Sequence, residues 1–142
     1  MRFPTHCLRK GTVLYHGTRA ADMFEEGGFA PRAPAWFSTS RNVAENFVNW
    51  NEGRCPRILV YRATRSIPKL VSIEDQHAMQ QLVEFIERQV GFDLTSSPAD
   101  LADELCNIHF SGWYIPNNYP EGDDIMLCDT DALELVERIC VE

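Results

Sequence analysis

Three short stretches of the chain carry residue types that could do chemistry, and the first is His16-Gly17-Thr18. An imidazole can exchange a hydrogen bond or a proton with a ligand. The glycine beside it leaves the backbone open to that ligand, because no side chain stands in the way. A histidine that only completes a hydrogen bond inside the fold is the alternative interpretation of His16.

The second stretch is residues 36–40, with the sequence WFSTS. Two bulky aromatic rings followed by three hydroxyls offer a planar ligand a stacking face and hydrogen-bond donors. Phe47, further along the chain, could supply a second face. A core strand that runs into a helix cap explains the same residues without a ligand, so both interpretations stay open.

The third stretch is acidic and has the sequence EGDDIMLCD, residues 121–129. Paired carboxylates bind metal ions or perform acid–base chemistry. We interpret Asp123 as part of a solvated turn after Pro120. Asp124 enters the strand itself, where aspartate is disfavoured, and we retain it as the candidate functional acid, with Glu121 as the alternative.

Several other kinds of site have no support in the sequence. There is no Gly-x-Ser-x-Gly elbow, no phosphate-binding Gly-x-x-x-x-Gly-Lys-Ser/Thr loop and no Gly-x-Gly-x-x-Gly motif. The five cysteines form no Cys-x-x-Cys pair, so we expect no metal site and predict that all five are reduced and structural.

The elements that must position these residues follow from periodicity and turn signals. Strands are expected at 12–17, 35–40, 57–63, 69–73, 112–115, 123–128 and 132–141, and helices at 19–26, 41–50, 74–90 and 98–108. Strands and helices do not alternate regularly, which favours an α+β fold over a doubly wound parallel sheet. We predict a single domain over 1–142, with a helical segment at about 74–108.

The composition limits the partners and the location. A formal net charge of −8 argues against non-specific binding to nucleic acid, which basic surfaces drive. No apolar run reaches the roughly 18 residues of a membrane helix, and the N-terminus lacks the apolar core of a signal peptide. We therefore expect an intracellular, cytoplasmic protein that does not bind membranes.

In this order, the stretches resemble the ADP-ribosyltransferase superfamily, and in particular its His-Tyr-Glu branch, which includes the poly-ADP-ribose polymerases. The matching segments are His16-Gly17-Thr18 at a strand end, AWFSTSRNVAENF, the apolar strand RILVYRA, and a late strand that runs from Asp124 to Asp129. The resemblance implies a split mixed or antiparallel β-sheet core flanked by helices. The segment at 74–108 has no clear counterpart in the family.

The resemblance also implies NAD as the co-substrate and a role for each matching residue. His16 would bind a ribose hydroxyl, and the backbone of Gly17 would pair with the nicotinamide carboxamide, with Thr18 completing the motif. The position of the family's tyrosine falls to Trp36 or Phe37. The remaining candidates are Ser38 and Ser40 as hydroxyl donors, Phe47 as a stacking ring, and Asp124 or Glu121 as the acid.

The implied activity is cleavage of the nicotinamide–ribose bond and transfer of ADP-ribose to an acceptor or to water. The acceptor is a protein, a nucleic acid or a small molecule. Aspartate for glutamate, and Trp or Phe for tyrosine, point to mono-ADP-ribosyl transfer rather than polymer synthesis. A catalytically silent module that binds NAD or ADP-ribose is the alternative. An RNA 2'-phosphotransferase ranks lower, because no basic cluster lies near His16.

Overall fold

Two β-sheets make up most of the computed structural model, which describes residues 2–17, 34–48, 57–91 and 98–140. The five-stranded sheet has the order β1 (Thr5–Leu8), β5 (Ile67–Ser72), β6 (Gly112–Tyr119), β7 (Gly122–Leu127) and β3 (Ala35–Phe37). Its neighbours are antiparallel except β5 and β6, which are parallel. The three-stranded sheet has the order β2 (Val13–Gly17), β4 (Arg57–Ala63) and β8 (Leu133–Cys140), and it is antiparallel throughout.

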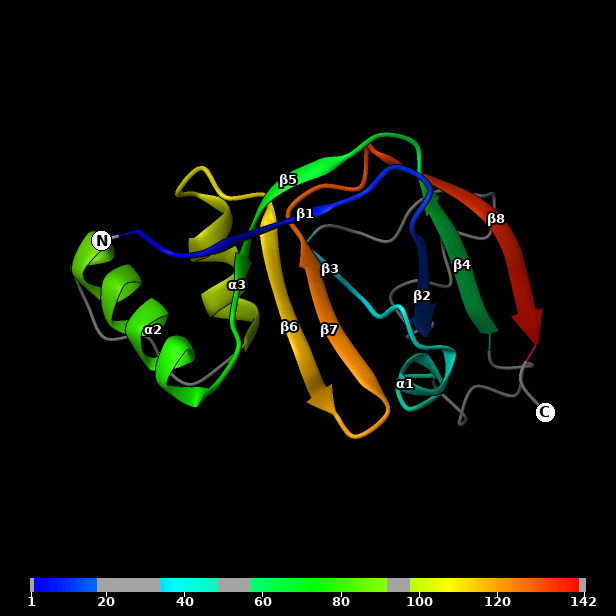
Figure 1. The fold of residues 1–142 in the computed structure, drawn as a ribbon, viewed down its shortest axis with the longest axis horizontal. Helices are drawn as coiled ribbons and strands as arrows, with labels where there is room; N and C mark the ends of the chain where they lie inside the picture. The colour runs from blue at the N-terminus through cyan, green and yellow to red at the C-terminus, as the bar shows by residue number, and fades with distance from the viewer. Residues whose placement is uncertain (1, 18–33, 49–56, 92–97, 141–142) are drawn as a thin grey trace.

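Helices cover the outer face of the five-stranded sheet. The apolar sides of α2 (Gln76–Val90) and α3 (Pro98–Cys106) pack on this face through residues such as Leu82 and Leu105, which meet Trp113 of β6. Figure 1 shows these helices on one side of the sheet and the three-stranded sheet on the other. The side chain of Asp75 caps the start of α2, and Gly91 ends it in the left-handed conformation.

A second apolar layer lies between the two sheets. Leu14 and Tyr61 of the three-stranded sheet meet Ile125 and Leu127 of β7 there. Met126, between them on β7, packs on the other face against the helices. Successive side chains of a strand point to opposite faces, so Ile125 and Leu127 face the second sheet and Met126 faces the helical side.

A short helix, α1 (Arg41–Glu45), lies beside the end of β2 (Figure 1). The side chain of Ser40 caps it by accepting a hydrogen bond from the backbone N–H of Val43. The chain leaves the helix at Asn46, so this helix is shorter than the predicted 41–50. Ala44 and Val48 pack on Ile58 of β4, which anchors the segment to the three-stranded sheet.

The prediction that every cysteine is reduced is wrong. Cys106, at the end of α3, forms a disulfide with Cys128, just after β7, and Cys140 is disulfide-bonded as well. Cys7 is an exposed free thiol. Cys106 and Cys128 are 22 residues apart in sequence, and only the packing of α3 on the sheet brings them together, so their spacing carried no signal.

The coarse fold prediction is confirmed. The chain is a mixed α/β protein with two sheets, and both helices of the predicted segment at 74–108 are present. The helix predicted at 19–26 lies outside the described residues. The strand expected at 112–115 continues to Tyr119, and the N-terminal β1 was not predicted. None of the helices in the described ranges is long and apolar enough to span a membrane.

Candidate functional site

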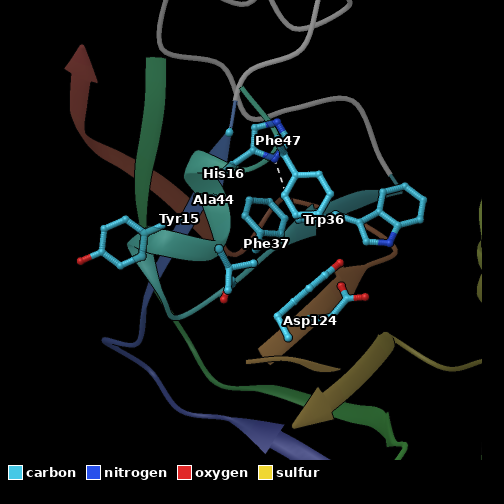
Figure 2. Close-up of a pocket in the computed structure, with 11 residues that line it drawn as sticks. Tyr15, His16, Trp36, Phe37, Ala44, Phe47 and Asp124 are labelled. Atoms are coloured by element: carbon cyan, nitrogen blue, oxygen red, sulfur yellow. Dashed lines mark hydrogen bonds between the residues drawn. The ribbon is translucent and has the colours of Figure 1, made fainter. Parts of the chain in front are cut away.

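A pocket opens at the end of β2, where β3, α1 and the β6–β7 hairpin converge (Figure 2). It contains about 340 Å³ of empty space, part of it continuous with solvent. Because that space includes open solvent, the enclosed part of the pocket is small. Its lining residues are Tyr15, His16, Gly17, Trp36, Phe37, Ser38, Val43, Ala44, Phe47, Tyr119 and Asp124.

Most of the candidate residues from the sequence meet in this one pocket. Those that line it are His16, Gly17, Trp36, Phe37, Ser38, Phe47 and Asp124. Thr18 lies outside the described residues. Two other candidates are not part of the lining: Ser40 caps α1, and Glu121 is exposed in the turn between β6 and β7. Of the two candidate acids, therefore, only Asp124 faces the pocket.

His16 is buried at the end of β2, and its ring is held by the backbone of β3. Its Nδ1 lies 2.7 Å from the carbonyl oxygen of Trp36. A backbone carbonyl only accepts, so Nδ1 carries the proton, and in the neutral ring Nε2 is the acceptor nitrogen. The ring of Phe37 packs beside it, with the ring centroids 5.5 Å apart. The imidazole therefore has a fixed orientation and a defined tautomer.

Gly17 is required by the packing of α1. A Cβ at this position would lie 2.2 Å from the carbonyl oxygen of Ala44 and 3.1 Å from backbone atoms of Phe47 and Val48. Backbone atoms cannot swing aside as a flexible side chain can, so any larger residue would displace this segment. This need for a glycine is independent of any ligand.

The backbone of Gly17 also points toward the pocket side of β2. The N–H and C=O of Tyr15 both pair with Ser38, at 2.8 and 3.0 Å. Alternate residues of an antiparallel strand direct their N–H and C=O to the same edge. Gly17, two residues beyond Tyr15, therefore directs its donor and acceptor away from β4, toward the edge where β3 and the pocket lie.

Aromatic rings form most of the pocket wall. Trp36 is half-buried and packs edge-on against Trp113, with the ring centroids 6.1 Å apart. Phe37 belongs to the apolar layer between the sheets. Phe47 and Tyr119 meet edge to face at 5.8 Å across the gap between α1 and the β6–β7 hairpin. These rings make the wall of the pocket largely aromatic.

Two aromatic lining residues were missed from the sequence. Tyr119 was overlooked because the strand was expected to end at Ile115. Tyr119 is an aromatic residue just before the turn, on the strand that pairs with the strand of the candidate acid. That position could have identified it as a lining residue. Tyr15 lies beside His16 near the end of β2, and its place in a strand gave no sign that its ring reaches the pocket. Figure 2 shows the ring of Tyr15 pointing away from Asp124.

Asp124 is the only acid among the described residues that line the pocket, and no lysine or arginine is among them. Burial raises its pKa to about 6, and the neighbouring charge of Asp123 adds to the rise. Two donors act in the opposite direction. Asn118 Nδ2 donates to Asp124 Oδ2 at 3.3 Å, and the Trp113 indole N–H also lowers the pKa, although it does not reach good hydrogen-bonding geometry.

The interpretation of Asp123 as part of a solvated turn is wrong. It is buried, and its carboxylate accepts three hydrogen bonds: from the Ser38 hydroxyl at 2.8 Å, from the Thr39 backbone N–H at 2.8 Å and from the Thr39 hydroxyl at 2.7 Å. β7 begins at Gly122, so both aspartates lie within the strand and face opposite sides. Asp123 therefore ties β7 to the junction between β3 and α1.

The hydrogen bond to Asp123 occupies the Ser38 hydroxyl, so Ser38 is not available as a donor to a ligand. Its hydroxyl proton is committed to Asp123, and its oxygen accepts from the backbone N–H of Ser40 at 3.0 Å. Both hydroxyl candidates thus hold the structure together locally, since Ser40 caps α1. Besides Ser38, the polar groups that line the described pocket include the backbone of Gly17, the ring of His16 and the carboxylate of Asp124.

Within the described ranges, no three His, Cys, Asp or Glu side chains gather as metal ligands. Comparison of the chain with protein-family models, curated proteins and solved structures finds no match. The fold and the pocket together define a mixed α/β protein with an aromatic pocket that holds one carboxylate. Any function must therefore be argued from the pocket itself.

Proposed function

We propose that the protein is an NAD-dependent mono-ADP-ribosyltransferase, which breaks the nicotinamide–ribose bond and transfers ADP-ribose to an acceptor or to water. One observation carries the proposal. His16, Gly17, the aromatic residues and a single buried acid come from separate parts of the chain and line one pocket. These are the residues that the resemblance to the His-Tyr-Glu branch assigns to NAD.

The composition of the pocket supports a nicotinamide ring as its ligand. The nicotinamide ring of NAD is flat and positively charged, and aromatic faces attract such a ring. Trp36, Phe47 and Tyr119 supply those faces. The carboxamide carries one acceptor and two donor hydrogens, which complement the N–H and C=O that Gly17 directs to this edge of β2.

The proposed chemistry requires one carboxylate near the ribose. When the bond between C1' and the ring nitrogen breaks, its electron pair leaves with nicotinamide and positive charge develops on the sugar, as in glycoside cleavage. Asp124 would stabilise that charge where it develops. The acceptor then adds to C1' and loses its proton. With a pKa of about 6, Asp124 is about nine-tenths ionised at pH 7.

His16 would orient the ribose. Its Nδ1–H is held by the Trp36 carbonyl, so Nε2 is the nitrogen with the lone pair, the type of acceptor that a ribose hydroxyl requires. Holding both the carboxamide and the ribose places the reacting bond beside the acid. The acceptor molecule stays open among proteins, nucleic acids and small molecules.

A silent NAD- or ADP-ribose-binding module is the second candidate, and one observation favours it. Asp124 is only 8 % exposed and has a shorter reach than the glutamate of the family. An acid recessed in this way could contact a bound ribose without supporting turnover. The RNA 2'-phosphotransferase ranks below both, because no lysine or arginine is found among the described lining residues.

The predicted cytoplasmic location stays a prediction, and the disulfides weigh against it. Cytosolic thiol systems keep most cysteines reduced, whereas disulfides persist in oxidising compartments. The Cys106–Cys128 bond and the disulfide-bonded Cys140 therefore favour an oxidising environment for the folded protein.

Nicotinamide release from NAD by the purified protein tests the proposal, with and without a cell lysate as a source of acceptors. Asp124→Asn keeps the shape of the side chain and should lower the rate about 100-fold or more, with NAD affinity measured by calorimetry nearly unchanged. Glu121→Gln removes an exposed acid outside the pocket and should leave the rate unchanged. NAD binding without release would favour the silent module, and absence of both would refute either function.

A further inference from the structure

Asp124 lies next to an irregular part of the pairing between β6 and β7. Ile115 pairs with Asp124, and Tyr119 pairs with Gly122. Three residues of β6, 116–118, thus lie opposite the single residue Asp123 of β7. A bulge of this kind bends a strand and re-aims its side chains, and bulges are frequent next to active sites.

Backbone conformation shows how the bulge is made. Asn117 has φ 54°, in the left-handed region, which asparagine adopts more readily than most residues. Pro116 precedes it and has no backbone N–H to donate to a ladder. The chain therefore leaves the regular pairing at Ile115 and rejoins it at Tyr119, two residues longer than β7 requires.

The bulge brings the Asn118 amide to the carboxylate. Asn118 is exposed, yet its Nδ2 lies 3.3 Å from Oδ2 of the buried Asp124. Ile115 lies opposite Asp124. If the antiparallel ladder continued regularly from there, Asn118 would lie opposite Glu121 in the turn. Asn118 reaches Asp124 only because the extra residues fold the strand back.

Trp113 approaches Asp124 along the same face of the sheet. Trp113 pairs with Met126, and Met126 and Asp124 are two residues apart on β7, so their side chains share a face. The indole Nε1 is fully buried and has no hydrogen-bond partner in the described part of the chain. Its N–H lies on the face of the sheet that carries Asp124, where the N–H dipole lowers the pKa of that carboxyl group.

We propose that Asn118 and Trp113 are positioning residues for Asp124, which aim its carboxylate into the pocket and favour its ionised form. The effect on turnover rests on the proposed function, whereas the effect on the carboxylate itself does not. The other ionisable groups around Asp124 in the described structure are Asp123 on its own strand, Tyr119 on β6, and Tyr15 and His16 across the pocket.

Measuring the titration of the Asp124 carboxyl group separates the effect on the carboxylate from the effect on turnover. Carbon-13 NMR would follow the titration of the Asp124 carboxyl group in the unmodified protein, in Asn118→Leu and in Trp113→Phe. Leucine matches asparagine in size without its donor, and phenylalanine keeps an aromatic ring without the indole N–H. Each variant should shift the Asp124 midpoint to higher pH, because a donor to the charged form is lost. Asn107→Leu, a change at an exposed asparagine after α3, should leave it unchanged.

The same variants should change nicotinamide release in a way that general loss of structure would not. The acid limb of the rate profile should move to higher pH together with the NMR midpoint, and kcat should fall more than KM rises. Asn118→Ala, which removes the donor with a smaller side chain at an exposed position, provides a second variant if the leucine variant does not fold.

The outcomes distinguish the two proposals. Shifted midpoints in a protein that does not release nicotinamide would support the positioning role and reject the transferase. Unchanged midpoints in both Asn118→Leu and Trp113→Phe would overturn the positioning role, whatever the activity.

Discussion

Replacing Asp124 with asparagine should make the protein more stable at neutral pH while removing the proposed activity. The unmodified protein must bury an ionised carboxylate above its titration range. Asparagine has the same shape as the neutral acid and can accept the hydrogen bond from Asn118 through its side-chain oxygen. The variant therefore keeps the contacts of the protonated aspartate without the cost of burying a charge.

The magnitude follows from the shift in pKa. Burial and the charge of Asp123 raise the pKa of Asp124 from 3.8 to about 6, and each unit corresponds to about 1.4 kcal/mol. The cost of ionisation in the folded state is thus about 3 kcal/mol, as an upper value.

The direction of the pH dependence follows from proton binding. Between pH 3.8 and about 6 the folded state holds more protons at this site than the unfolded state. The stability contributed by the protonated form is therefore lost as the pH rises through this range. The difference in unfolding free energy between Asp124→Asn and the unmodified protein should be near zero below pH 4, grow up to about pH 6, and level off above it.

Urea unfolding at several pH values between 4 and 8 would measure this difference. Glu121→Gln serves as the matched control, because it removes one negative charge from an exposed position. A constant or negative difference across the range would refute the reasoning that Asp124 is buried at an energetic cost. If the stability gained by Asp124→Asn were largest at low pH, the direction assigned to the pKa shift of Asp124 would be wrong.

Three further perturbations test the packing around the pocket. Gly17→Ala should lower the unfolding free energy by about 1–3 kcal/mol, because its Cβ meets the backbone of α1; thermal melting measures this. Asp123→Ala should cost about 3 kcal/mol, because it removes the acceptor of three hydrogen bonds at the β3–α1 junction; urea unfolding measures this. A double Cys106→Ser, Cys128→Ser variant should lose about 3 kcal/mol, the chain-entropy value for a 22-residue separation, measured by unfolding without reductant.

The aspartate and cysteine variants each have a control in the chain. Asp129→Ala removes an exposed aspartate close to the same strand. Cys7→Ser changes an exposed free thiol. If a control variant lost as much unfolding free energy as the variant it is matched with, the cause given for that loss would be wrong.

Local patterns in the sequence were enough to predict several elements and part of the site. The β-rich run that ends in His16-Gly17 forms β2, and the helical spacing with its Asp75 cap and terminal Gly91 forms α2. These features depend on neighbouring residues, because capping and strand propensity act over only a few positions. The placement of His16 at a strand end was therefore readable in advance.

The roles of the two aspartates could not be assigned from the sequence. A strand alternates its side chains between two faces, so a shift of one residue exchanges the positions of Asp123 and Asp124. Which of them faces the pocket depends on where β7 starts and on its pairing with β6 and β3.

Other features also arise only when distant segments meet. Tyr119 reaches Phe47, Asn118 reaches Asp124, and Cys106 reaches Cys128 through the folding of the hairpin and of α3 onto the sheet. The sequence by itself determined which residue types were available and where the local strands and helices form. Tertiary structure decided which of them face one another, because pairing register and a two-residue bulge are set by contacts across the whole sheet.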